Sequence, residues 1–430
     1  MHVCRRWRSL VFESPRSLGL RLYCTPETFA KNALDVWPAL PLIITGFRFE
    51  NMTLSSGTDE LTAALGHSNR ICEVNLSDLA GWQLKRVLAL MEVSFPELTV
   101  LRLSANVDVK PIIIPDSPSF LAGSASRLQI IELFGIPFPG LANLLSSATH
   151  LVHLELADIP RSGYISPEAI VALLSTLSSL RTLCLDFRPR ARPDGESQSL
   201  LPPKHTHLPA LESLEFGGVT EYLEELVTCI DTPRLFEMDI TFYSQIDFDC
   251  PRLVQFINRT PTLTRALDEA HVQFIYGFAE VKFQSRKSGI AGLQINIAYG
   301  QGDWQLSFME QVCSSSLHPL STVEDLYIEN DSSYKVWKND ATESTLWLGV
   351  LLPFTAVKNL YLSKEFAPAI GSPALQELIG ARITEVLPGL QNIFVERVDP
   401  SGYRTLEENI GQFVSARQLS DHPVAISVWD

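Results

Sequence analysis

The chain has 430 residues, of which 46% are hydrophobic and 19% charged, and these proportions exclude extended disorder. Its formal net charge of −15 disfavours nucleic acid and anionic membrane surfaces as main partners, because phosphate groups attract lysine and arginine. Seven cysteines without a Cys-x-x-Cys pair indicate reduced thiols in the cytoplasm or nucleus rather than a disulfide framework, and no apolar run approaches the length of a membrane span.

The first residues predict a short amphipathic helix. Val3, Trp7 and Leu10 recur at helical spacing, and a Ser-Pro pair then ends the helix. The segment is rich in arginine and poor in acids, so a capping helix and a mitochondrial transit peptide are both open interpretations.

A six-residue phrase with apolar residues at its first, fourth and sixth positions recurs along the chain. Leu151, Leu154 and Leu156 form its clearest copy. The eleven copies begin at Ile44, Ile71, Leu98, Leu128, Leu151, Leu180, Leu211, Leu235, Val323, Val357 and Leu390. Successive copies start 23 to 34 residues apart, except for the 88 residues between Leu235 and Val323. This period is typical of leucine-rich repeats. The sequence therefore predicts an α/β leucine-rich repeat solenoid, or horseshoe, with a concave parallel sheet and convex helices.

Between the phrases, the apolar spacing changes to that of a helix, as a repeat of strand and helix requires. Ser166, Pro167 and Glu168 have the order of a helix start, with a capping residue, proline in the first turn and an acid beside it. Further helices are predicted in residues 81–93, 138–145, 220–230 and 372–387.

Two stretches interrupt the repeat pattern. Residues 188–207 are rich in proline, glycine and charge, which predicts an exposed loop whose arginines could contact an acidic partner. Residues 241–320 change to alternating apolar positions, which predicts an irregular section of strands joined without full helices. The repeat domain is expected to span residues 17–430, and Val424 to Val428 form a last strand that could cap its open end.

Motifs for catalysis, nucleotides and metals are missing from the sequence. It contains no phosphate-binding loop, dinucleotide fingerprint, His-Glu-x-x-His helix or nucleophile elbow. His150 and His153 are close in sequence, as are His205 and His207, but neither pair has further ligands at a spacing typical of zinc sites. We therefore expect a protein that is not an enzyme and that has no cofactor and no bound metal.

The residue between the last two apolar positions of each phrase faces away from the core, onto the concave sheet. From the first phrase to the last, these residues are Arg48, Asn75, Arg102, Glu132, Glu155, Cys184, Glu215, Asp239, Tyr327, Tyr361 and Phe394. An acidic part is thus followed by an aromatic part. We expect Glu132, Glu155, Glu215 and Asp239 to attract a basic segment of a protein target, and Tyr327, Tyr361 and Phe394 to hold an apolar or guanidinium group by burial and cation–π contact. Solvated strand surfaces have similar compositions, so this assignment is a hypothesis.

The segment Val-Cys-Arg-Arg-Trp-Arg-Ser-Leu-Val, followed by Ser-Pro-Arg, resembles the closing helix of the F-box in fungal F-box proteins with leucine-rich repeats. The resemblance implies that residues 1–16 are an F-box remnant, with Val3, Cys4, Trp7 and Leu10 as its characteristic residues. It also implies that the protein is the substrate-recognition subunit of a cullin-type (SCF) ubiquitin ligase, linked through a Skp-family adaptor. The alternative is a stand-alone repeat scaffold without a ligase link.

The sequence predicts weak or absent binding to the adaptor, because an F-box grips a Skp-family protein with all its helices and residues 1–16 resemble the last one alone. Co-purification of residues 1–430 with a Skp-family adaptor measures this. A stoichiometric complex would contradict the prediction.

Overall fold

The computed structural model describes residues 21–25, 40–45, 56–106, 120–123, 126–138, 140–187, 205–243, 248–265, 267–275, 277–287, 291–298, 305–330, 341–363, 385–396, 410–411 and 413–429. Two compact units make up the chain. Unit 1 comprises Met1–Leu211 with Cys229–Thr232, and unit 2 comprises Glu212–Thr228 with Pro233–Asp430. Among the described residues, no helix is long and apolar enough to cross a membrane.

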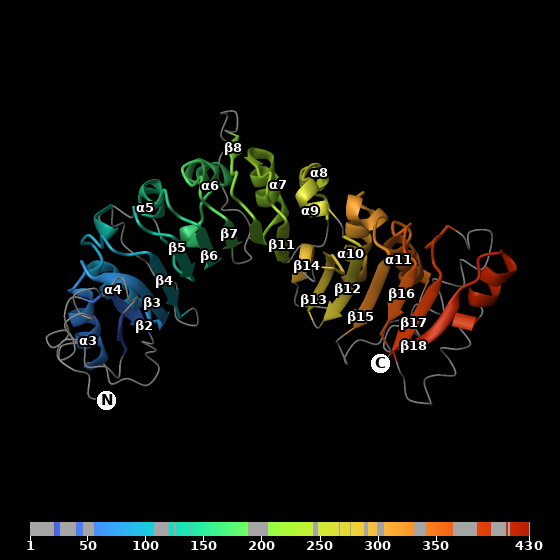
Figure 1. Ribbon diagram of the computed structural model, residues 1–430, viewed down its shortest axis with the longest axis horizontal. Helices are drawn as coiled ribbons and strands as arrows, with labels where there is room; N and C mark the ends of the chain where they lie inside the picture. Colours follow the sequence, from blue (N-terminus) through green and yellow to red (C-terminus); the bar gives the residue numbers. More distant parts are fainter. Residues whose placement is uncertain are drawn as a thin grey trace, which may run out of the picture. The chain divides into compact units, whose positions relative to one another are not determined.

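Unit 1 contains a parallel sheet whose strands follow the order of the chain (Figure 1). They are β1 (Leu22–Cys24), β2 (Leu42–Thr45), β3 (Ile71–Leu79), β4 (Val100–Ala105), β5 (Ile130–Phe134), β6 (His153–Ile159) and β7 (Thr182–Phe187). The connecting segments contain α3 (Ser56–Leu65), α4 (Gly81–Leu90), η1 (Phe120–Gly123), α5 (Leu141–Ser147), η2 (Arg161–Gly163) and α6 (Pro167–Leu174). A separate two-stranded parallel sheet joins β8 (Thr206–His207) to β10 (Ile230–Asp231). Crossover connections between successive parallel strands have the same handedness. They therefore pass over the same face of the sheet, and the helices lie on that face.

Helix α6 shows how the local sequence sets the boundaries of a repeat. The Ser166 hydroxyl accepts a hydrogen bond from the backbone N–H of Ala169, and Pro167 occupies the first turn, where its missing N–H leaves no bond unmade. Ile170, Val171 and Leu174 then pack into the core. The helix begins where the sequence predicts it.

Unit 2 begins with parallel strands β9 (Ser213–Gly218) and β11 (Glu237–Tyr243) and ends with parallel strands β15 (Asp325–Asn330), β16 (Asn359–Leu362), β17 (Asn392–Glu396) and β18 (Ala425–Trp429). Its helices are α7 (Thr220–Cys229), α8 (Pro251–Arg259), α9 (Pro261–Thr264), α10 (Gln305–Ser314) and α11 (Ala341–Leu351), with the 3-10 turn η3 (His318–Ser321).

The long gap between repeat phrases holds a three-stranded insertion in the sheet. Strands β12 (Glu269–Ile275), β13 (Phe278–Gln284) and β14 (Ala291–Ala298) pair antiparallel with one another. Strand β14 lies parallel to β11 and β12 lies parallel to β15, so the order in the sheet is β11-β14-β13-β12-β15. Gly277, with φ of 71°, provides the left-handed backbone that the turn between β12 and β13 requires.

The core consists of the apolar residues of the repeat phrase. Leu101, Leu154 and Leu183 are 0% exposed in unit 1, as is Leu214 in unit 2, where Leu360 is 3% exposed. All five lie in parallel pairings. The fold class predicted from the sequence is confirmed as a leucine-rich repeat solenoid. The sheet is antiparallel at β12 to β14, inside the section 241–320 where the sequence predicts strands joined without full helices, because short connections there replace the crossover helices that parallel pairing needs.

Several predicted features lie outside the described residues: the helix with Val3, Cys4, Trp7 and Leu10, the column residue Arg48, residues 188–204 of the loop, and most of the helix predicted in 372–387. Of the loop, residues 205–207 are described. There, His207 Nδ1 lies 2.8 Å from Asp231 Oδ2 in the small sheet of unit 1.

Leu154→Ala should lower the free energy of unfolding by about 2 to 5 kcal/mol, because it leaves a cavity between neighbouring repeats that cannot fully collapse. Urea denaturation of the full chain measures the loss. Val93→Ala is the control, since Val93 is 51% exposed and its truncation should cost less than about 0.5 kcal/mol. Equal losses for the two variants would contradict this prediction.

Candidate binding surface

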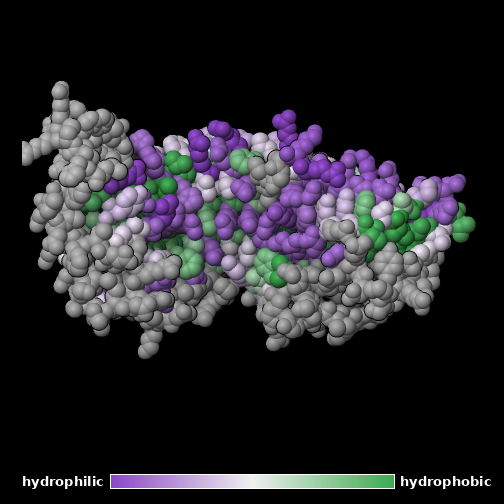
Figure 2. Space-filling model, turned by 60° about the horizontal axis from the view of Figure 1, so that its bottom comes forward, coloured by the Kyte–Doolittle hydropathy of each residue, from purple (hydrophilic) through white to green (hydrophobic). Residues whose placement is uncertain are grey.

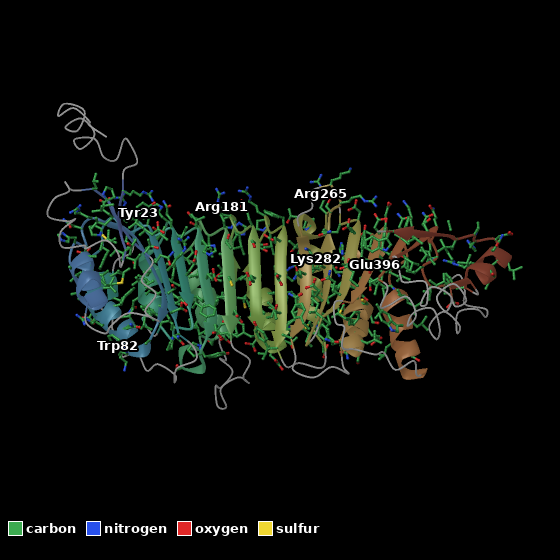
Figure 3. All side chains as sticks on the ribbon, turned by 90° about the horizontal axis from the view of Figure 1, so that it is seen from below. Tyr23, Trp82, Arg181, Arg265, Lys282 and Glu396 are labelled. Atoms are coloured by element: carbon green, nitrogen blue, oxygen red, sulfur yellow. The ribbon has the colours of Figure 1, made fainter. Side chains whose placement is uncertain are left out.

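Each unit has a sheet face that its helices leave uncovered, which we call the open face (Figure 1). Figure 2 shows hydrophilic side chains over much of the visible surface, with a hydrophobic area toward the end that holds β17 and β18. Figure 3 looks onto the strands from the open side, where Lys282 and Glu396 are labelled in unit 2. Because parallel strands in register place equivalent residues side by side, the open faces are organised in rows that cross the strands.

The central row of unit 2 runs through residues that are paired in register on successive strands. In spatial order, these are Glu215, Asp239, Gln294, Lys282, His271, Tyr327, Tyr361, Phe394 and Ser427. The structure thus brings the sequence-predicted Glu215 and Asp239 into one row with Tyr327, Tyr361 and Phe394. The insertion adds Gln294, Lys282 and His271 between them.

Four rings of the central row form a continuous stack. The ring centroids of His271 and Tyr327 are 4.4 Å apart, those of Tyr327 and Tyr361 are 4.2 Å apart, and those of Tyr361 and Phe394 are 4.6 Å apart. Successive planes differ by 4°, 7° and 10°. Trp429 meets the stack edge-on, with centroids 5.9 Å from Tyr361 and 6.5 Å from Tyr327.

This geometry corrects part of the expectation for the aromatic side chains. Tyr361 has Tyr327 over one face and Phe394 over the other, and Tyr327 lies in the same way between His271 and Tyr361. A guanidinium group cannot lie over a ring face that another ring covers, so cation–π contact at these two tyrosines is wrong. The residue paired with Phe394 on β18 is Ser427, whose small side chain does not continue the stack.

The acidic end of the row is partly buried and crowded with carboxylates. Burial raises the pKa of Asp239 to about 6, and the neighbouring charges of Glu215 and Glu280 act in the same direction. Asn296 donates a hydrogen bond of 2.7 Å to Asp239 Oδ1, which partly opposes the shift. Burial likewise raises the pKa of Glu280. A positively charged ligand would relieve this repulsion.

His271 connects the acidic and aromatic parts. Its Nε2 lies 2.7 Å from Glu269 Oε1, and its Nδ1 lies 3.4 Å from Glu329 Oε1. Burial lowers the pKa of His271, but hydrogen bonds to Glu329 and Glu269 outweigh burial and raise it overall. The same contact lowers the pKa of Glu329. The two carboxylates thus favour the charged form of the imidazole, which stacks against Tyr327.

A second row of polar side chains lies beside the ring stack, formed by the residues two positions before the rings on β15, β16 and β17. Asn392 Nδ2 donates to Asn359 Oδ1 at 2.8 Å, and Asn359 Nδ2 donates to Asp325 Oδ1 at 2.6 Å. Arg286 closes the series with an Nη2–Oδ2 distance of 2.7 Å to Asp325. This network fixes β15, β16 and β17 to one another beside the rings.

The open face of unit 1 carries the other two acidic candidates. Glu132 and Glu155 are register partners on β5 and β6. Arg102 Nε donates to Glu132 Oε2 at 2.7 Å, so Glu132 already has a cationic partner. Cys184, next in the row, is 5% exposed and offers little contact area.

Sequence reasoning missed Gln294, Lys282 and His271. The alternating apolar residues around them were visible, and each of the three lies between two core positions. The sequence does not show the reversed spatial order β14-β13-β12, because that order depends on which strand of the insertion pairs with β11. Trp429 was also missed, since it reaches the stack from the strand at the far edge.

Comparisons with known proteins assign the chain to no family. A scan against protein-family models finds no match, and neither does a comparison with curated proteins. Among solved structures, the chain is similar to the leucine-rich repeat-containing protein LegL7 from Legionella pneumophila, at 14% identity and a TM-score of 0.30. The match covers 92% of this chain and 97% of that one. The fold class, a leucine-rich repeat solenoid, rests on the strand register and the buried core of the chain itself.

Asp239→Asn should stabilise the protein at pH 8 by about 1 kcal/mol, after allowance for partial solvent screening. The folded chain must ionise a carboxyl group whose pKa is about 6, against 3.8 ordinarily, so the cost appears as pH rises through that interval. Near pH 4, Asp239 is protonated in the folded chain and the gain should largely vanish. Urea denaturation at both pH values measures it. An equal gain at both, or a loss at pH 8, would contradict the prediction.

Proposed function

We propose that this protein is a non-catalytic interaction module whose open face in unit 2 binds a basic segment of a partner protein. The observation that supports the proposal most is the continuity of the central row, in which Gln294 and Lys282 join an acidic end to a ring stack that ends at Phe394. This row, together with Glu237, Glu280 and Glu396 beside it, is called the unit 2 surface.

The charge of the surface favours a basic partner. Strands β9, β11, β13 and β14 carry Glu215, Glu237, Asp239 and Glu280 on the open face, against one basic residue, Lys282. A net charge of −15 over the whole chain adds a long-range field of the same sign. Complementary charge of this kind mainly speeds association and is screened by salt.

The end of the ring stack favours arginine over lysine. Phe394 is half-buried, and the residue paired with it on β18 is the small, exposed Ser427. Glu396 is two residues further along β17 and therefore on the same face. A planar guanidinium can lie on a ring while its N–H groups reach a carboxylate, which a lysine ammonium does less well.

Peptides of equal length made of arginine, lysine or glutamate test the proposal directly, with fluorescence anisotropy as the readout. We expect the arginine peptide to bind most tightly, the lysine peptide more weakly and the glutamate peptide not at all. Phe394→Ala should reduce the preference for arginine over lysine by about 3- to 30-fold, which corresponds to about 0.5 to 2 kcal/mol. Loss of the arginine preference places the contact at Phe394.

Charge reversal tests the acidic part separately. The double variant Glu215→Lys with Glu237→Lys should slow association of the arginine peptide and flatten its salt dependence. Glu92→Lys with Glu168→Lys changes the net charge equally, at exposed positions of unit 1, and is the matched control. If the two double variants had equal effects, net charge alone would explain the attraction. This result would contradict a site on the unit 2 surface.

A link to a ubiquitin ligase is supported only by the sequence of residues 1–16. We propose, on the resemblance of residues 1–16 to the closing helix of an F-box, that the module is the target-binding part of an SCF-type substrate receptor. A stand-alone scaffold is the alternative. A test is whether a partner captured by the unit 2 surface is ubiquitinated in cell extract when the chain is added, and loses that modification with the Phe394→Ala variant.

A further inference from the structure

A cluster of three potential metal ligands lies on the open face of unit 1, apart from the surface discussed above. Glu132 belongs to β5, and His153 and Glu155 belong to β6. Glu132 and Glu155 are register partners, and His153 precedes Glu155 by two residues on the same face. Two rigid neighbouring strands thus hold all three side chains together.

The distances suit a small cation without rearrangement of the backbone. His153 Nε2 lies 3.4 Å from Glu155 Oε2 and 3.8 Å from Glu132 Oε1, and all three ligand atoms lie within 4.8 Å of one another. Ligand atoms about 2.0 to 2.2 Å from a zinc ion lie roughly 3.0 to 3.5 Å apart. The side chains are about one-third exposed, at 29% for Glu132, 27% for His153 and 37% for Glu155, so small rotations would close the difference.

A hydrogen bond alone accounts poorly for this arrangement. One imidazole nitrogen faces two carboxylate oxygens, yet a single N–H can point along only one of these directions. A cation between the three atoms would satisfy both carboxylates and the nitrogen lone pair together. The competing account is a protonated His153 that forms ion pairs with both carboxylates.

Arg102 orients the first ligand. Its Nε donates to Glu132 Oε2 at 2.7 Å, and its Nη1 donates to Glu73 Oε1 at 3.3 Å. Glu132 is thereby fixed with its other oxygen, Oε1, directed at His153. Partners of this type set the orientation of ligands at metal sites. Glu73, Glu132 and Glu155 against Arg102 leave a formal charge of −2, which a divalent cation would balance.

We propose that Glu132, His153 and Glu155 bind a divalent transition-metal cation such as Zn²⁺, with the remaining coordination position open to solvent or to a partner side chain. One imidazole with two carboxylates is a ligand set that suits transition metals, whereas Ca²⁺ takes six to eight oxygen ligands. The sequence predicts no bound metal, because Glu132 comes from the preceding repeat and its place beside His153 does not show in the spacing of ligands along the chain.

Isothermal titration of the metal-free full chain with ZnCl₂ tests the site. We expect one saturable site that Ca²⁺ does not fill, and at least about 100-fold weaker binding in His153→Gln and in Glu155→Gln, each of which removes a ligand. His207→Gln is the matched control, since His207 is an exposed histidine of unit 1 that also faces a carboxylate at 2.8 Å. The control should bind zinc as the parent does.

Two further measurements separate the site from cysteine binding and from misfolding. Co²⁺ bound in place of Zn²⁺ should show no thiolate-to-cobalt absorption, because the proposed ligands contain no sulfur. The variants should melt at the parent temperature without metal, and Zn²⁺ should raise the melting temperature of the parent but not of the variants. Lack of saturable binding by the parent, unchanged binding in both variants, or a thiolate band overturns the proposal.

Discussion

Leu101 and Leu154 are completely buried although each belongs to a strand of seven or fewer residues, and this is possible because each repeat is covered by the next. A single strand and helix cannot exclude water from the apolar face between them, so the stability of the array resides in the contacts between neighbours. In-register pairing of the strands follows from the same constraint, because a slip of one residue would turn every buried leucine outward.

The register that protects the core also arranges the exposed residues. Equivalent positions in successive repeats fall into rows, so single residues separated by about thirty positions in the chain become neighbours. The insertion β12 to β14 continues the rows across the sheet, since its two outer strands run parallel to β11 and β15. His271 can therefore stack on Tyr327 although they come from different kinds of repeat.

Much of the fold could be predicted from the sequence, because the repeat phrase reports both the strand and its buried face. Leu214 and Leu360 needed no further information than their places in the phrase. The surface was predictable in part. Glu215, Asp239 and the three aromatic residues were found from alternation alone, which is a property of one strand. Which residues lie beside them depends on pairing between strands, and the hairpins reversed that order for His271, Lys282 and Gln294. Ring orientation was equally hidden, because stacking of Tyr361 between two rings is a property of three strands together.

The proposed function places a basic segment on the unit 2 surface, and in particular at the Phe394 end of the ring stack. Hydroxyl-radical footprinting with mass spectrometry, with and without the arginine peptide, tests it on the unaltered chain. The account predicts that Phe394 loses reactivity when the peptide is bound, while the exposed rings of Trp82 and Phe134 in unit 1 react as before. Protection of Trp82 or Phe134 with Phe394 unchanged would contradict it.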